Sequence, residues 1–291
     1  MHDYLLSLLL GVIEGLTEFL PVSSTAHLRI TEALLGIDLS NGFWKMYSIV
    51  IQLGAILCLP IYFRSRIAKF LSTFPQGENK DRTALNHPLT LTFIAFVFTA
   101  GPAYLLTRVI GKNLENLYIM AFSFLVGGVV MWVVDAKYGE YEGGDAEATA
   151  AEQIEEMGVV RAVWIGLCQI LAAVFPGTSR SMATIVAGQL VQLSRTAALE
   201  FSFLLSIPTL GVSTVYEFYK FLKPGHGEVS TAPHIDAHGY IALAIGFVVS
   251  FFVAWAVVAW FMNWVREKGF RAFAIYRLIL GLAVLFWAAH A

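Results

Sequence analysis

Long apolar runs dominate this chain, and its charged residues are concentrated in the gaps between those runs. A helix that crosses the roughly 30 Å hydrocarbon core of a bilayer needs about 20 mostly apolar residues. Six stretches approach or exceed that length, namely 46–63, 88–107, 116–134, 201–216, 239–265 and 272–291. The pattern therefore predicts six membrane-spanning helices.

Two further apolar segments, 4–36 and 158–193, are interrupted by proline. The first breaks at Pro21 and the second at Pro176-Gly177, and serines follow each break. Proline lacks the N–H that a helix interior needs, and serine is a favoured N-cap, so each segment is predicted to fold as helix, turn, helix. Each half is short for a crossing, which indicates re-entrant hairpins whose turns are surrounded by protein or by a polar cavity.

The two broken segments resemble each other and indicate an internal repeat. Placing Pro21 on Pro176, 155 residues later, aligns Gly11 with Gly166, Glu14 with Gln169, Ser24 with Ser179 and Thr25 with Arg180. Each half then holds one hairpin and three spans, and because three is odd the second half is inverted in the membrane. The predicted organisation is a first repeat over 1–134, an acidic linker over 135–157 and a second repeat over 158–291, together forming one integral membrane domain.

Composition agrees with an all-α polytopic membrane protein. Hydrophobic residues make up 57% of the 291 residues, charged residues 14%, and the mean hydropathy is +0.68. Such a chain is too apolar for a soluble protein of this size. Its net charge of -2 offers no basic field for phosphates, which argues against a nucleic-acid partner.

Basic residues in the predicted loops give the orientation. One side receives Arg64, Arg66, Lys69, Lys80, Arg82, Lys137, Arg161, Arg195, Arg266, Lys268 and Arg271, and the other receives Lys45, Arg108, Lys112, Lys220 and Lys223. The richer side is predicted to be cytoplasmic. The first hairpin then enters the membrane from outside, the second enters from the cytoplasm, and the acidic linker is a solvated cytoplasmic loop.

The first hairpin carries a cluster of reactive side chains. Glu14 and Glu18 are four residues apart on one helix face, where two carboxylates repel unless they share a proton, a divalent cation or an arginine. Ser23, Ser24, Thr25 and His27 open the next helix, whose N-terminus favours an anion. Ser24 and His27 form a candidate nucleophile and acid/base pair, although the serines also suit simple N-caps.

The second hairpin adds a fixed cation. Its turn and first helical residues contain Gly177, Thr178, Ser179, Arg180, Ser181 and Thr184. The arginine fork suits phosphate oxygens, and glycine allows a close backbone approach. If the two hairpins meet, their side chains form a phosphate or diphosphate site inside a lipid-facing protein.

Four sequence motifs extend this interpretation. They are GVIEGLTEFLPVSSTAHL at 11–28, QLGAIL at 52–57, PGTSRSMAT at 176–184 and EFSFLLSIP at 200–208. Together they resemble the undecaprenyl-diphosphate phosphatase family of the bacitracin-resistance type over essentially the whole chain. Ala26 and Met182 depart from the family, in which glycine is common at both positions; each lies beside polar residues and replaces none.

The resemblance implies hydrolysis of the terminal phosphate of a C55 polyprenyl diphosphate, which returns the monophosphate carrier to cell-wall synthesis. It implies catalytic roles for Glu14, Glu18, Ser24, His27 and Arg180. Substrate-binding roles fall on Ser23, Thr25, Gly177, Thr178, Ser179, Ser181 and Thr184. Expected surroundings are the bacterial cytoplasmic (inner) membrane and its lipids, with a site open to the periplasm.

Several alternatives stay open at this point. Either Ser24 or a water held by Glu18 attacks phosphorus; we favour Ser24, with His27 as its acid/base. A Mg²⁺ or Ca²⁺ ion held by Glu14 and Glu18 is a candidate cofactor, and no organic cofactor is expected. Because inverted repeats with broken helices also occur in transporters, movement of a phosphorylated polyprenyl lipid is the rival function. The oligomeric state is open, a homodimer included.

Overall fold

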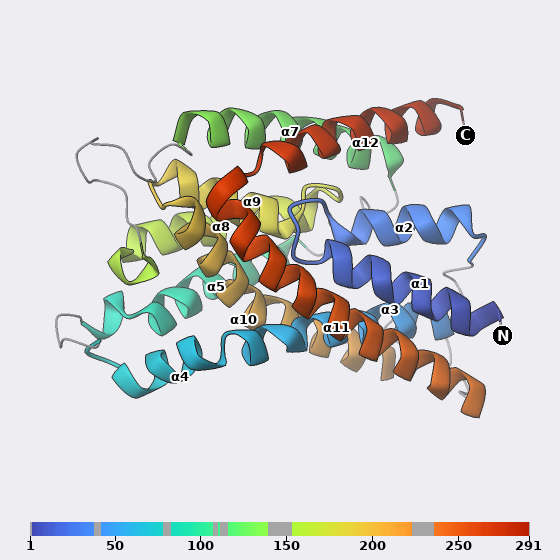
Figure 1. Ribbon diagram of the computed structural model, residues 1–291, viewed down its shortest axis with the longest axis horizontal. Helices are drawn as coiled ribbons and strands as arrows, with labels where there is room; N and C mark the ends of the chain where they lie inside the picture. The colour runs from blue at the N-terminus through green and yellow to red at the C-terminus, as the bar shows by residue number, and fades with distance from the viewer. Residues whose placement is uncertain are drawn as a thin grey trace. The chain divides into compact units, whose positions relative to one another are not determined.

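The computed structural model describes residues 2–37, 42–77, 83–106, 110, 116–138, 153–222 and 236–290, and in this part of the chain the secondary structure is helical, without strands (Figure 1). The α-helices are α1 (His2–Thr17), α2 (Ser24–Leu34), α3 (Gly42–Tyr62), α4 (Arg64–Thr73), α5 (Pro88–Leu105), α7 (Leu117–Tyr138), α8 (Val159–Val174), α9 (Arg180–Leu190), α10 (Arg195–Leu222), α11 (Ala237–Lys268) and α12 (Arg271–His290). Two short 3₁₀ helices, η1 (Ala84–Asn86) and η3 (Ile154–Glu156), precede α5 and α8.

The long apolar helices agree with the predicted spans. Among the described residues α5, α7, α10, α11 and α12 are each long and apolar enough to cross a membrane. The sixth predicted span is the apolar part of α3, which is followed by α4 after a bend of 62°. The bend comes just after Pro60, in the last turn of α3, where proline weakens the helical hydrogen bonds. The chain is therefore a multi-pass membrane protein.

Both proline-broken segments fold as helix, turn, helix, as predicted. Helices α1 and α8 have sixteen residues each, and α2 and α9 have eleven each. The residue before each short helix, Ser23 or Ser179, has a φ of +70°. This matched conformation corrects the predicted alignment after the turn by one residue. Ser23, rather than Ser24, corresponds to Ser179, because the second turn has one more residue after its proline.

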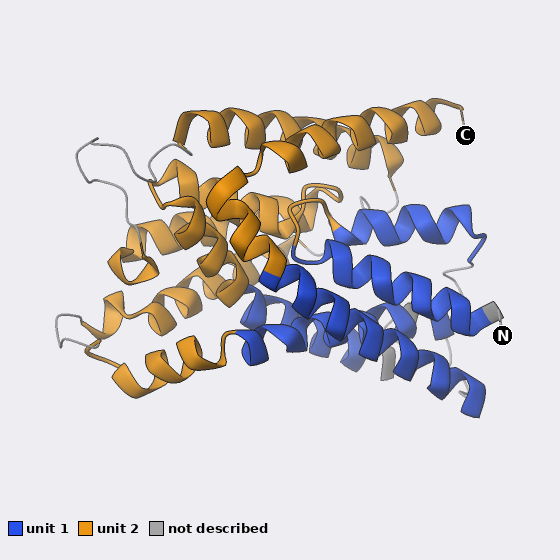
Figure 2. Cartoon of the chain, viewed as in Figure 1, with its two compact units in different colours: residues 1–19, 24–62, 206–259 blue, residues 20–23, 63–205, 260–291 orange. Residues whose placement is uncertain are grey.

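The chain divides into two compact units (Figure 2). Unit 1 comprises residues 1–19, 24–62 and 206–259, and unit 2 comprises residues 20–23, 63–205 and 260–291. Each unit combines residues from both predicted repeats. Most of the predicted acidic linker, residues 139–152, lies outside the described residues.

Helix α11 contacts both α1 and α3 of unit 1 through glycines. A Cβ on Gly11 would lie 2.9 Å from the carbonyl oxygen of Gly246, so α1 approaches α11 backbone to backbone. A Cβ on Gly54 of α3 would lie 2.5 Å from the carbonyl oxygen of Phe247. Small residues at such crossings are typical of helices packed in membranes. Ser250 strengthens the second contact by donating a hydrogen bond to the Ile51 carbonyl at 2.7 Å.

Unit 2 contains two comparable helix pairs. Gly166 of α8 lies against α5, where an added Cβ would clash with the Ala95 carbonyl oxygen, and Thr99 donates to the Gly166 carbonyl at 2.8 Å. Helices α7 and α12 run side by side (Figure 1), and Gly128 and Gly281 allow their close approach.

Charged side chains gather in two ion-pair clusters of unit 2. Arg66 pairs with Glu200 and with Glu155, each at 2.6 Å. Arg195 pairs with Asp135 at 2.8 Å, and the same carboxylate accepts the backbone N–H of Phe270 at 3.1 Å. These clusters join the beginning of α4, the region before α8, the beginning of α10 and the turn between α11 and α12. All of these segments were predicted to face the cytoplasm.

Candidate active site

In unit 1 the structure brings Glu18 and Ser24 together. Glu18 follows the last residue of α1, and its backbone N–H still donates to the Glu14 carbonyl at 2.9 Å. The turn then returns the chain so that Ser24, the first residue of α2, donates its hydroxyl hydrogen to the Glu18 carboxylate. Glu14, Glu18 and Ser24 are all buried, with exposed fractions of 1%, 6% and 9%. A hydroxyl bonded to a buried carboxylate is a suitable arrangement for an activated nucleophile.

The other candidates of the first hairpin surround this pair in sequence. His27 is one turn after Ser24 on the same face of α2 and is half-buried. Ser23 is buried in the turn, whereas Thr25 is exposed. The sequence paired Ser24 with His27; the structure gives the Ser24 hydroxyl a carboxylate partner, Glu18.

In unit 2 the two proline turns lie against each other, and Arg277 of α12 joins them. Its fully buried guanidinium donates to the Pro21 carbonyl at 3.0 Å, the Gly177 carbonyl at 3.0 Å and the Ser123 carbonyl of α7 at 2.9 Å. The Ser179 hydroxyl also lies 3.5 Å from the Leu20 carbonyl, to which it donates. The structure therefore brings together residues 20–23 and 177–179, which are about 155 positions apart in sequence.

The second turn is shaped by a glycine and a serine cap. Gly177 has a φ of +92°, and a Cβ there would lie 2.7 Å from the Met120 carbonyl oxygen, so both conformation and space require glycine. Ser179 caps α9 by accepting the Met182 N–H at 3.3 Å. This cap presents Arg180 at the first position of α9, where the helix dipole favours an anion.

The remaining candidates of the second hairpin are buried. Thr178 is 9% exposed, and Ser181 and Thr184 are almost fully enclosed. The Thr184 hydroxyl lies 2.7 Å from that of Ser202 on α10 and donates to the Arg180 carbonyl at 3.0 Å. Thr184 therefore helps hold the first turn of α9 in place.

Comparison with known proteins assigns this arrangement to a family. The family model described as Bacitracin resistance protein BacA matches residues 7–283. The chain belongs to the BacA family. The resemblance seen in the four motifs is thereby confirmed.

Relatives within the BacA family are similar over nearly their full length. An undecaprenyl-diphosphatase of Koribacter versatilis (strain Ellin345) is 61% identical over 290 residues, which is 99% of each chain. An undecaprenyl-diphosphatase of Bradyrhizobium sp. (strain ORS 278) is 40% identical over 97% of this chain and 96% of its own. The undecaprenyl-diphosphatase 1 of Frankia alni is 37% identical over 95% and 92%.

Sequence reasoning missed the role of Arg277 in this BacA-family protein. Arg277 is the only Asp, Glu, Lys or Arg residue in the apolar stretch 272–291. An ionisable side chain within a span is costly unless it has partners, and that rule was the available signal. The partners are backbone carbonyls, which no residue pattern marks.

Glu14 and Glu18 are the two carboxylates at which the sequence predicted a divalent cation. Within the described ranges, no group of three or more His, Cys, Asp or Glu side chains is arranged to hold a metal ion. Glu14 and Glu18 therefore offer two carboxylates and no complete cage. Mg²⁺ is commonly held by one or two carboxylates together with substrate phosphates, which fits this pair.

Proposed function

We propose that the protein is an undecaprenyl-diphosphatase, which converts undecaprenyl diphosphate and water to undecaprenyl phosphate and inorganic phosphate. This reaction recycles the lipid carrier of cell-wall synthesis. The relative that is 61% identical over 99% of the chain carries that name, and a multi-pass membrane protein suits a substrate with a long hydrocarbon chain. The structural observation that carries the proposal is the buried hydrogen bond from Ser24 to Glu18.

The chemistry begins with this pair. The Ser24 hydroxyl oxygen attacks the terminal phosphorus and transfers its proton to Glu18. The bond from that phosphorus to the bridging oxygen breaks, and undecaprenyl phosphate leaves with the bridging oxygen. Water then hydrolyses the phosphoserine and releases inorganic phosphate. Glu18 is the base for the first step because its carboxylate accepts the Ser24 hydrogen bond, and His27 serves as acid/base for the leaving group and the water.

Charge neutralisation is the second requirement of phosphoryl transfer. In this proposal Arg180 binds phosphate oxygens through its guanidinium fork, and the Thr178 hydroxyl and the backbone N–H groups of Ser179 and Ser181 assist. Ser23 and Thr25 contribute in the same way at the beginning of α2. A divalent cation held by Glu14 and Glu18 would neutralise the charge that develops on the phosphate oxygens.

The proposed architecture is an inverted repeat with two re-entrant hairpins, placed in the inner membrane with its site open to the periplasm. Helix contacts in the separate units support the repeat. Helix α1 packs on α11 in unit 1, and α8 packs on α5 in unit 2. Helices α5 and α11 are the second spans of the two halves, so each hairpin begins on the second span of the other half. The third spans, α7 and α12, pack on each other.

The decisive experiment measures phosphate release from undecaprenyl diphosphate by the purified protein in detergent. We expect Ser24→Ala to lower kcat by more than about a thousandfold. The exposed Ser72→Ala in α4 is the matched control and keeps wild-type activity. Acid quenching and mass spectrometry of the peptide containing Ser24 should recover phosphoserine from the wild type.

The outcomes separate the alternatives. Ser24→Ala activity within tenfold of wild type would assign the attack to water. Intact substrate after incubation with the wild type would contradict hydrolysis and leave lipid transport as the explanation.

A further inference from the structure

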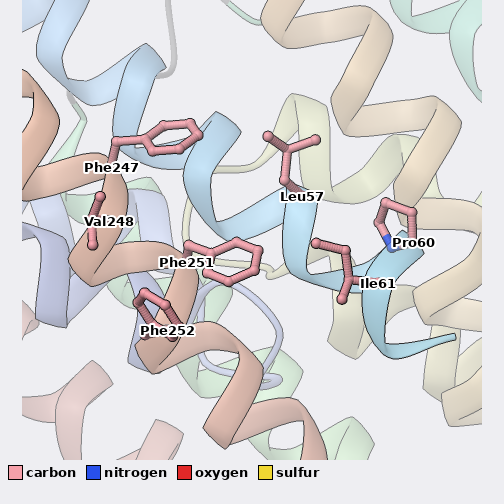
Figure 3. Close-up of a pocket in the computed structure, with 7 residues that line it drawn as sticks. All are labelled: Leu57, Pro60, Ile61, Phe247, Val248, Phe251 and Phe252. Atoms are coloured by element: carbon pink, nitrogen blue, oxygen red, sulfur yellow. The ribbon is translucent and has the colours of Figure 1, made fainter. Parts of the chain in front are cut away.

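An apolar groove lies between α3 and α11 in unit 1. It has a volume of about 300 Å³ and is lined by Leu57, Pro60, Ile61, Phe247, Val248, Phe251 and Phe252. Figure 3 shows that Phe247 and Phe251 extend from α11 towards the residues of α3. Every lining residue is apolar, so the groove offers no side-chain hydrogen bond to a ligand.

The groove follows from the way the two helices cross. At Gly54 the backbones approach closely, since an added Cβ would be 2.5 Å from the Phe247 carbonyl oxygen. The next turn of α3 carries Leu57, Pro60 and Ile61, whose bulk prevents an equally close contact. Leu57 and Phe252 are 39% and 57% exposed, so the groove is open at the outer surface of the helices.

Along the packed helices of unit 1, the groove lies close to the level of the proposed nucleophile, Ser24, and its partner Glu18. Gly15, which lies between Glu14 and Glu18 in sequence, packs against α11, where an added Cβ would be 2.8 Å from the Ser250 carbonyl oxygen. Ser250 lies between Val248 and Phe251, two of the residues that line the groove. Glu18 accepts the Ser24 hydroxyl. The groove therefore begins within about one helical turn of the place where α11 contacts the helix that carries the two glutamates.

We infer that this groove binds the isoprenoid chain of the lipid diphosphate, in the part next to the diphosphate. The inference rests on the proposed function and adds a binding site for the hydrocarbon portion of its substrate. The isoprenoid carbon is bonded directly to the diphosphate, so a chain whose phosphates react near Glu18 must leave at that depth. A groove without polar groups suits a hydrocarbon that needs no hydrogen bonds.

Size and tethering decide between an isoprenoid and an ordinary lipid acyl chain. The volume is at the lower end of the range for ligand pockets, about 300–1,000 Å³, so the groove holds a few isoprene units while the rest of the chain stays in the bilayer. Binding of the diphosphate raises the effective concentration of its own chain at the groove. An acyl chain of a bulk phospholipid has no such tether.

Photocrosslinking tests the occupant directly. Phe252 is replaced by p-benzoylphenylalanine, and the protein is placed in phosphatidylethanolamine and phosphatidylglycerol vesicles with the methylene-bridged analogue of undecaprenyl diphosphate. The matched control carries the probe at Phe286 of α12, which is 68% exposed. We expect an adduct with the mass of the analogue at position 252 and only phospholipid adducts at position 286. Phospholipid adducts alone at position 252, or crosslinked protein dimers, would overturn the inference.

Kinetics provides a second readout that separates a filled groove from a damaged fold. Leu57→Trp should raise the KM for undecaprenyl diphosphate about tenfold, because the indole takes the space of buried isoprene methyl and methylene groups. The inhibition constant of inorganic pyrophosphate, which has no chain, should not change. The control Leu282→Trp, on the exposed face of α12, should change neither constant.

An equal loss of substrate and pyrophosphate binding in Leu57→Trp would contradict the inference. Failure of the proposed function would look different, since wild-type protein would then release no phosphate from the lipid at all.

Discussion

At the residue scale, two buried carboxylates lie within one turn of each other. Glu14 and Glu18 are 1% and 6% exposed, and like charges so close in a poorly solvated region repel. A divalent cation relieves that repulsion, so chelator should abolish phosphate release and Mg²⁺ or Ca²⁺ should restore it. The measurement is the rate of phosphate release before and after each addition. Activity that is indifferent to chelator would remove the cation from the proposal.

The two glutamates should differ when each becomes an amide. Glu18→Gln should lower kcat by about 10²–10⁴-fold, because an amide cannot accept the proton of Ser24. Glu14→Gln should be milder, since the repeat places Gln169, also buried, at the equivalent position of α8. The exposed Glu267→Gln at the end of α11 serves as the control. A ranking with Glu14→Gln as the more damaging change would reverse the assigned roles.

Arg277 is a single side chain on which two turns depend. Arg277→Lys keeps the charge, but one ammonium on a shorter stem cannot reach the Pro21, Gly177 and Ser123 carbonyls together. Loss of two such bonds, at about 1.5 kcal/mol each, costs roughly 3 kcal/mol. The melting temperature in detergent should fall by roughly 5 °C. Arg266→Lys, at an exposed position of α11, should leave it unchanged, and an equal fall in both variants would contradict the assigned role.

Individual residues also show where sequence reasoning reached its limit. Glu18 and Ser24 were selected by residue type and position, and the structure joins them. The partner of Ser24 was missed because a turn of unknown geometry separates the two residues in sequence. Arg277 was missed because it binds backbone carbonyls, which every residue possesses. The alignment of the two hairpins at their prolines was wrong by one residue after the turn. The second turn is one residue longer, and residue types alone do not show where a turn ends.

At the element scale, spans and breaks were predictable because each has a local cause. Apolar length marked α5, α7, α10, α11 and α12, and the prolines marked the two interrupted hairpins. The 62° bend between α3 and α4 was not predicted. Pro60 weakens the helix at that point, but it does not give the direction in which α4 continues, where Arg66 pairs with Glu155 and Glu200. Those partners are far away in sequence.

Helix crossings provide a stability prediction at this scale. Gly54→Ala places a methyl group 2.5 Å from the Phe247 carbonyl oxygen, so α3 and α11 must separate. We expect the free energy of unfolding to fall by about 1–3 kcal/mol. Gly101→Ala in α5 is the matched control, since among the described residues no atom beyond the adjoining turns of its own helix lies within 4 Å of the new methyl group. It should be neutral or stabilise by about 0.5–1 kcal/mol, because alanine is the better helix former.

Thermal melting of both variants in the same detergent decides the question. If the melting temperature of Gly54→Ala equals or exceeds that of Gly101→Ala, the close approach of α3 and α11 does not contribute to stability.

At the scale of the whole molecule, composition predicted a polytopic membrane protein, but the division into two units was not predicted. Each unit takes residues from both halves of the chain, and residues 20–23 belong to unit 2 while both of their neighbours belong to unit 1. Such a division depends on long-range packing. A hydropathy pattern reports which residues leave water, and it does not report which helix covers them.

Orientation in the membrane is the last prediction, and it rests on the whole set of basic loop residues. Segments assigned to the cytoplasm meet in the ion pairs Arg66–Glu200 and Arg195–Asp135 of unit 2, as segments on one side of a membrane should. The positive-inside rule then places the loop between α10 and α11 outside. A cysteine replacing Gly225, in a Cys58→Ala, Cys168→Ala background, should react with an impermeant maleimide on intact cells.

A cysteine replacing Gly144 in the acidic linker is the matched control and should react only after lysis. Both positions lie outside the described residues, so the labelling tests the charge rule independently of helix packing. The reverse pattern would invert the protein and move the predicted entrance of the first hairpin to the cytoplasmic side. Equal labelling of both positions on intact cells would instead indicate dual insertion. In either case the proposed opening of the Ser24 and Glu18 site towards the periplasm would be wrong, while the hydrolysis measured in detergent would stand.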